Sequence, residues 1–133
     1  MKYKKQIQLI AAIVTLIVFP VITFYLMEAY THNPFEEVRS WAQFFNILLF
    51  ELLAWIFVSV TGKIQSGLRI ELVIAMIYGI ANAYVVRFRT NPIVPWDIFS
   101  WKTAVSVASN YDFKPDTRMV VVTLVFLGMI VLL

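Results

Sequence analysis

The sequence contains no cysteine and a single histidine, His32. The missing cysteine excludes disulfide bonds, a thiolate nucleophile and a zinc-thiolate site. One histidine excludes a cluster of histidine metal ligands, and we interpret His32, which lies among acidic residues, as a solvated side chain. There are only four glycines, and they form no glycine-rich phosphate loop. We therefore predict no catalytic residue and no metal site in this chain.

Charged residues are also scarce. They make up 14% of the 133 residues, whereas a soluble domain carries roughly 25%. Hydrophobic residues make up 61%, which is more apolar surface than a soluble domain of this length can hide. The net charge is +3, but the basic residues lie near the N-terminus and between apolar runs, as in proteins oriented in a membrane. The sequence predicts a membrane protein without a nucleic-acid partner.

Four apolar runs are candidate membrane spans, at residues 7–27, 41–61, 70–86 and 119–133. A helix of about 20 residues crosses a hydrocarbon core roughly 30 Å thick. The last run covers only roughly 22 Å at about 1.5 Å per residue, so we predict an incomplete span. We expect one all-α transmembrane domain over residues 1–133, a polytopic helix bundle that is part of a longer protein. Pro20 lies inside the first run and is expected to kink it.

The distribution of basic residues predicts the orientation in the membrane. Lysines precede the first run, the 62–69 loop carries Lys63 and Arg69, and the 28–40 loop has one arginine against three glutamates. Basic loops stay in the cytoplasm, so we expect a cytoplasmic N-terminus. The 87–118 segment is then outside; its five basic residues argue against this, but the first helix usually dominates.

A fifth helix is predicted at residues 96–109. Ile98, Trp101, Val105 and Ala108 recur with the spacing of one helix face. The segment is too short and too polar to span a bilayer. We interpret it as an amphipathic helix in the outer interface, with its tryptophans at headgroup depth. The alternative is a loop helix packed on the bundle.

Several polar residues lie inside the predicted spans. Glu51 is near the middle of the second span, where a charge costs about 3 kcal/mol on insertion scales. Counting residues along antiparallel neighbours places Tyr78 level with Glu51, and Asn46 level with Asn82. We predict two interhelical hydrogen bonds, each contributing roughly 0.6–2 kcal/mol. A role in lipid handling or proton movement is the alternative.

Arg87 and Arg89 mark the outer end of the third span. One interpretation is interfacial anchoring with an ion pair to Asp97. The other is that the guanidinium groups grip a lipid phosphate, whose geometry they match with two hydrogen bonds. The candidate headgroup-binding residues are Arg87, Arg89, Trp96, Asp97, Trp101 and Lys102.

The run RFRTNPIVPWDIFS at residues 87–100, with Thr103-Ala104 and VASNY at 107–111, resembles the membrane region of the lipoteichoic acid synthase family. These are sulfatase-like phosphoglycerol transferases of Gram-positive bacteria, in which an FRGxPxxPWDxxSxxTAxxVxxNY-like run precedes the fourth span. Thr90-Asn91 departs from the Gly-Thr or Gly-Ser that is common there.

The resemblance implies five spans followed by an extracytoplasmic catalytic domain. That domain uses a threonine nucleophile and a divalent metal, usually manganese, to move glycerol phosphate from phosphatidylglycerol onto a growing polymer. This chain matches the first three and a half spans and no part of the catalytic domain, so no catalytic or metal residue is carried over.

The implied function is that of the membrane-anchoring and lipid-presenting part of such an enzyme, in the bacterial plasma membrane, during cell wall biogenesis. Its partners would be a phosphatidylglycerol-like phospholipid and its own downstream catalytic domain or other membrane proteins. Two alternatives stay open. Glu51 and Pro20 weakly favour a small multi-pass transporter component, and nothing in the sequence excludes a membrane assembly partner.

Overall fold

The protein is built from helices, and the all-α prediction is confirmed. The computed structural model describes residues 2–133, with side chains from Tyr3 onward, and every regular element in that range is helical. Three helices are long and apolar enough to cross a membrane. These are α1 (Lys2–Glu28), α3 (Ser40–Thr61) and α4 (Ile64–Arg89). A shorter apolar helix, α6 (Thr117–Leu132), follows. The chain is therefore a membrane protein.

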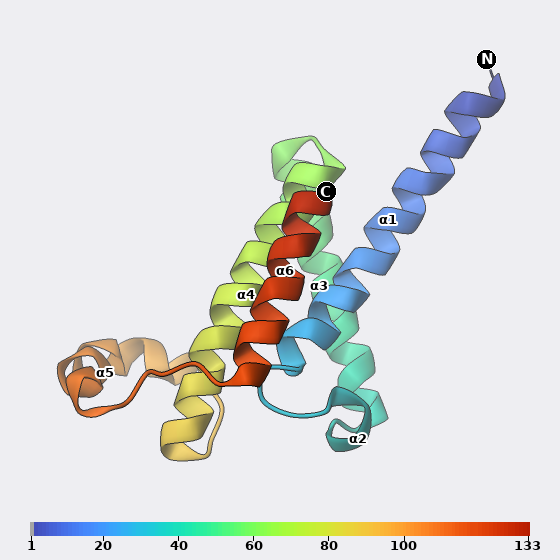
Figure 1. Ribbon diagram of the computed structural model, residues 1–133. Helices are drawn as coiled ribbons and strands as arrows, with labels where there is room; N and C mark the ends of the chain where they lie inside the picture. The colour runs from blue at the N-terminus through green and yellow to red at the C-terminus, as the bar shows by residue number, and fades with distance from the viewer. Residues whose placement is uncertain (1) are drawn as a thin grey trace.

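The bundle is organised around α3 and α4, which run antiparallel; α1 packs against both of them, and α6 packs against α4 (Figure 1). Its core contains Phe24, Leu72 and Phe126, all fully buried. Apolar side chains also cover the outside of the helices, as expected where lipid replaces water as the solvent. The N-terminal half of α1 extends away from the bundle (Figure 1), and Tyr3, Ile7 and other apolar side chains there are exposed.

The connections gather at the two ends of the bundle (Figure 1). We call one end the turn end, because the two-residue turn Gly62–Lys63 joins α3 to α4 there. The other is the loop end, which carries the 29–39 connection with α2 (Pro34–Glu37) and the 90–116 segment. The 90–116 segment contains three short helices, η1 (Pro95–Ser100), α5 (Trp101–Val107) and η2 (Ala108–Asn110).

Two glycines allow the close packing of α3 and α4 at the turn end. Gly62 has φ +68° and its N–H bonds to the Val58 carbonyl, which ends α3 in the left-handed conformation that glycine adopts most easily. A Cβ at Gly67 would lie 2.5 Å from a Val58 methyl carbon and 2.6 Å from the Val58 nitrogen. Small residues allow such close helix contact in membranes. Gly67 therefore sets α4 directly against α3.

The third predicted span, 70–86, was too short. The helix begins at Ile64 and ends at Arg89, because no proline interrupts it and because positively charged residues are tolerated at the ends of a membrane helix. The predicted 62–69 loop is thus mostly helical. This extension moves Glu71 from the edge of the predicted span into the body of α4.

Candidate functional site

Arg89 fastens the start of the 90–116 segment at the loop end. Its Nη1 and Nη2 donate to the two carboxylate oxygens of Asp97 at 2.8 and 2.7 Å, and Nη2 also donates to the Pro92 carbonyl at 2.8 Å. The ion pair predicted for Arg89 is confirmed. The Val94 N–H donates to the same carboxylate at 2.8 Å. Hydrogen bonds from the Arg89 guanidinium, and then from Val94, lower the pKa of Asp97 to about 2.

Arg87 fastens the other end of that segment. The prediction that Arg87 pairs with Asp97 was wrong. Its guanidinium donates to Asp116 and to the Lys114 carbonyl, each at 2.8 Å, and lies 5.5 Å from the centre of the Tyr84 ring. Asp116 also caps α6 by accepting from the Met119 N–H at 2.7 Å. Asp116 was not among the predicted partners, because it is far from Arg87 in sequence and only the path of the chain brings the two together. We call these two ion pairs the arginine clamp.

The helical segment between the clamped ends extends sideways from the bundle (Figure 1). Trp96 and Trp101 are 76% and 58% exposed, and Lys102 is exposed. An apolar groove of about 410 Å³ lies between this segment and α4, lined by Val85, Phe88 and Val105 among others, with Arg89 at its edge. The predicted candidate headgroup residues are therefore at one end of the bundle, but the two arginines already have partners.

A second groove, of about 360 Å³, lies inside the membrane-spanning region between α3, α4 and the end of α1. Its polar lining consists of Glu28, Asn46, Glu71, Tyr78 and Asn82, and the remaining lining is apolar. We call it the polar groove. Three of the four predicted intramembrane polar residues meet here; Glu51 is not part of the lining.

The two direct interhelical hydrogen bonds predicted from the sequence are not formed among the described residues. The Asn46 amide donates to the Ala42 carbonyl at 2.9 Å, and the Asn82 side-chain oxygen accepts from the Ile93 N–H at 2.8 Å. The prediction assumed a loop at residues 62–69, whereas only Gly62 and Lys63 separate α3 from α4. The short turn places Gly67 against Val58, which shifts the register of α3 and α4.

Glu71 and Glu28 are the two members of the polar groove that sequence reasoning missed, and Glu71 is the more deeply buried. Its side chain is 2% exposed, and neither carboxyl oxygen has a hydrogen-bond partner. Glu71 follows Gly67 by one turn of α4, close to the tight contact with the Val58 backbone. The available signal was the spacing of Glu71, Tyr78 and Asn82, which places all three on one face of a helix that includes residue 71.

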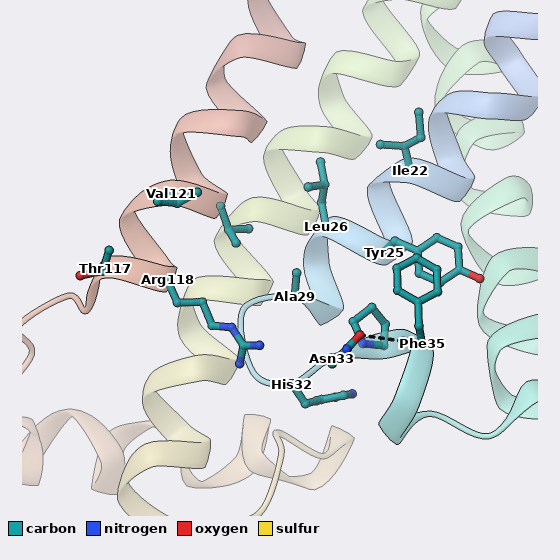
Figure 2. A pocket seen from close by; sticks show the side chains of 12 residues that line it. Ile22, Tyr25, Leu26, Ala29, His32, Asn33, Phe35, Thr117, Arg118 and Val121 are labelled. Atoms are coloured by element: carbon teal, nitrogen blue, oxygen red, sulfur yellow. Dashed lines mark hydrogen bonds between the residues drawn. The ribbon is translucent and has the colours of Figure 1, made fainter.

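A third hollow, of about 700 Å³, lies between the end of α1 and the start of α6. Figure 2 shows Ile22, Leu26 and Val121 along its walls, with Arg118 and His32 toward the loop end. The His32 ring nitrogen Nε2 lies 2.9 Å from a Glu28 carboxylate oxygen, and its side chain is 29% exposed. His32 is therefore a partly buried partner of Glu28, and the prediction of a solvated side chain was wrong.

Neither a metal site nor a known relative is found. Within residues 3–133, whose side chains the structure describes, no group of three or more His, Cys, Asp or Glu residues could hold a metal ion. The resemblance implies manganese only in a catalytic domain that is not part of this sequence. No family model, curated protein or solved structure matches this chain.

Proposed function

We propose that this chain is the membrane-anchoring and lipid-presenting module of a lipoteichoic-acid-synthase-like phosphoglycerol transferase. It would act in the bacterial plasma membrane, with its N-terminus in the cytoplasm and the loop end outside. The observation that carries the proposal is the arginine clamp. Two ion pairs from one helix hold both ends of an aromatic, largely exposed segment beside the bundle.

The exposed segment has the chemistry of a membrane interface. Trp96 and Trp101 are amphipathic rings, which favour headgroup depth. The Lys102 ammonium next to them is free to attract an anionic phosphate, which contributes about 1 kcal/mol per basic residue near a charged membrane surface. The apolar groove behind the segment offers acyl chains a surface that ends near Arg89.

This geometry supports a division of roles among the candidate headgroup residues. The guanidinium groups of Arg87 and Arg89 already donate to carboxylates and backbone carbonyls. They therefore act as positioning residues for the segment. The groups that would meet a phosphatidylglycerol-like headgroup are Lys102 and the two tryptophans. A catalytic domain joined to this module would find its lipid substrate at high local concentration, because both are tied to one surface.

Depth-dependent fluorescence quenching tests the placement of the segment. The chain is reconstituted with lipids brominated either near the headgroup or deep in the acyl chain. In a variant with Trp41 and Trp55 changed to Phe, we expect stronger quenching by the shallow bromine. In the matched variant with Trp41, Trp96 and Trp101 changed to Phe, the remaining Trp55 on α3 should respond to the deep bromine. No quenching of Trp96 and Trp101 by either lipid would refute the interfacial placement.

The lipid class and the enzyme need separate tests. Native mass spectrometry of the reconstituted chain should show more retained phosphatidylglycerol than phosphatidylcholine, with the preference reduced in Lys102→Gln. Equal retention of both lipids would contradict lipid presentation. Reading the gene beyond the codon for Leu133 tests the enzyme: a fifth span and a domain with a threonine and metal-ligand cluster supports it, and an immediate stop codon refutes it.

A transport role is the second candidate, favoured by the unpartnered carboxyl of Glu71 inside the bundle. It predicts flux of an ion or solute in liposomes containing this chain, whereas an anchor predicts none.

A further inference from the structure

Glu71 is a buried carboxyl group with nothing in the described residues to neutralise it. Both of its oxygens are enclosed and lack hydrogen-bond partners. An ionised carboxylate without a partner is strongly disfavoured in a low-dielectric interior. The group is therefore suited to holding a proton or another cation.

The polar groove connects Glu71 with the loop end. Tyr78 and Asn82 follow Glu71 on the same face of α4, and Asn46 faces them from α3. From Glu71 to Asn82 this path is about 16 Å long at 1.5 Å per residue. At its far end lies Glu28, whose partner His32 is partly exposed. The groove is wide enough for water molecules, and its hydroxyl, amide and carboxylate groups can hold them by hydrogen bonds.

The opposite direction is closed. Toward the turn end, Leu68 and Ala54 are fully buried, and Gly67 lies against the Val58 backbone. The groove is bordered on its membrane side by Leu49 and Ile74, both about half exposed and apolar. Lipid there offers no group that carries a proton. Exchange with water is thus possible from one end only.

The other charged groups around Glu71 do not neutralise it. The acidic residue of α3 is Glu51, which cannot neutralise a carboxylate, and α1 contributes Glu28, which is paired with His32. On α4, Tyr78 shares the face of Glu71, whereas Arg69 donates to the Ile130 carbonyl at 3.3 Å. The charged residue of α6 is Arg118, at the loop end of that helix.

We propose that Glu71 is a proton-binding site that exchanges its proton with water from the loop end alone, along Tyr78 and Asn82. A proton fits this site better than a metal cation, because a cation needs several oxygen ligands around it. Among the described side chains, no group of three or more His, Cys, Asp or Glu residues could hold a metal ion. The inference rests on residues that the proposed lipid-presenting function does not use, so either can fail alone.

Infrared spectroscopy of the full chain in lipid nanodiscs tests the site directly. A protonated carboxyl has a C=O stretching band that shifts when its hydrogen is replaced by deuterium. We expect such a band in the wild-type protein, its loss in Glu71→Gln, and its retention in the matched control Glu51→Gln. Transfer to D₂O should shift the band, and Tyr78→Phe or Asn82→Leu should slow that shift several-fold.

Four results would overturn the proposal. The first is a wild-type spectrum without a protonated carboxyl band at any pH. The second is a band that survives in Glu71→Gln protein with wild-type helicity. The third is a band that never shifts in D₂O, since that proton would be locked in place. If Glu71→Gln does not fold, the rates of the D₂O shift in wild type and Tyr78→Phe are compared instead. A slower shift in Tyr78→Phe supports the proposal, and equal rates contradict it. A band that disappears on adding Na⁺ or K⁺ would identify a cation site and also refute it.

Discussion

The two polar regions of this molecule handle charge in opposite ways. At the loop end, every oxygen of Asp97 accepts from Arg89, and the pair lies at the surface. In the bundle, Glu71 is enclosed and both of its oxygens lack partners. Satisfied charges near water hold chain segments in place, whereas an unsatisfied buried charge costs stability and points to function. We therefore assign a structural role to the arginine clamp and regard the polar groove as the candidate functional site.

The largest effect should come from the closed end of the polar groove. Gly67→Val would place methyl groups where the Val58 backbone now lies. We expect a loss of about 1–3 kcal/mol or more in the free energy of unfolding, because the helices must separate. Unfolding by SDS in mixed micelles measures it. Gly128→Val, with open space around the Cβ, is the control and should change the midpoint little.

Removing the buried carboxyl group of Glu71 should stabilise the protein. We expect Glu71→Leu to raise the free energy of unfolding by about 1–3 kcal/mol, since an unsatisfied buried polar group disappears. The same SDS titration measures the gain. Glu71→Gln keeps a polar group and should gain less. If Glu71→Leu is destabilised, the carboxyl has a partner or ligand in the membrane, and the contrast with the arginine clamp fails.

Breaking one half of the arginine clamp should free the segment without unfolding the bundle. In Arg89→Gln, the ion pair and the Pro92 contact are lost. Trypsin should then cleave after Lys102 several-fold faster, while the helical circular dichroism stays unchanged. Arg69→Gln, at the opposite end of α4, is the matched control. Equal cleavage rates in all three proteins would mean that the clamp does not position the segment.

Acid should release the same segment. The pKa of Asp97 is lowered to about 2 from its ordinary value of 3.8. A lowered pKa means that the ion pair contributes fully above the ordinary value and is lost as the pH falls through about 2. The Val94 amide donates to Asp97, so its protection against hydrogen exchange should persist at neutral pH and be lost only in strong acid. The effect should be absent in Asp97→Asn, whose amide does not titrate.

The smallest effect concerns the lipid surface. Lys102→Gln should weaken binding of phosphatidylglycerol by about 1 kcal/mol, roughly fivefold, because one surface charge is removed. Lipid titration followed by fluorescence of Trp96 and Trp101 measures the affinity. The control is Lys5→Gln, near the N-terminus of α1 and away from the loop end. It should leave the lipid affinity unchanged if the 90–116 segment is the lipid-facing surface.

Composition and hydrophobic patterning were enough to predict an all-α membrane protein. Long apolar runs have few stable alternatives in lipid, where a helix satisfies its own backbone. They also showed which polar residues lie at membrane depth: Asn46, Tyr78 and Asn82 line one groove. The pairing of Arg89 with Asp97 was likewise predictable, because the two are close in sequence.

Tertiary structure decided which polar groups meet. The register of α3 against α4 depends on the turn between them. This turn consists of Gly62 and Lys63 alone, and Gly67 packs directly against Val58. A shift of a few residues in antiparallel helices changes every facing pair, and Glu71 lines the polar groove with Tyr78, whereas Glu51 does not. The partner of Arg87 depends on where a chain of more than 25 residues returns to the bundle at Asp116. Apolar patterning selects helices because it acts locally, whereas these contacts are set by how closely two helices can pack.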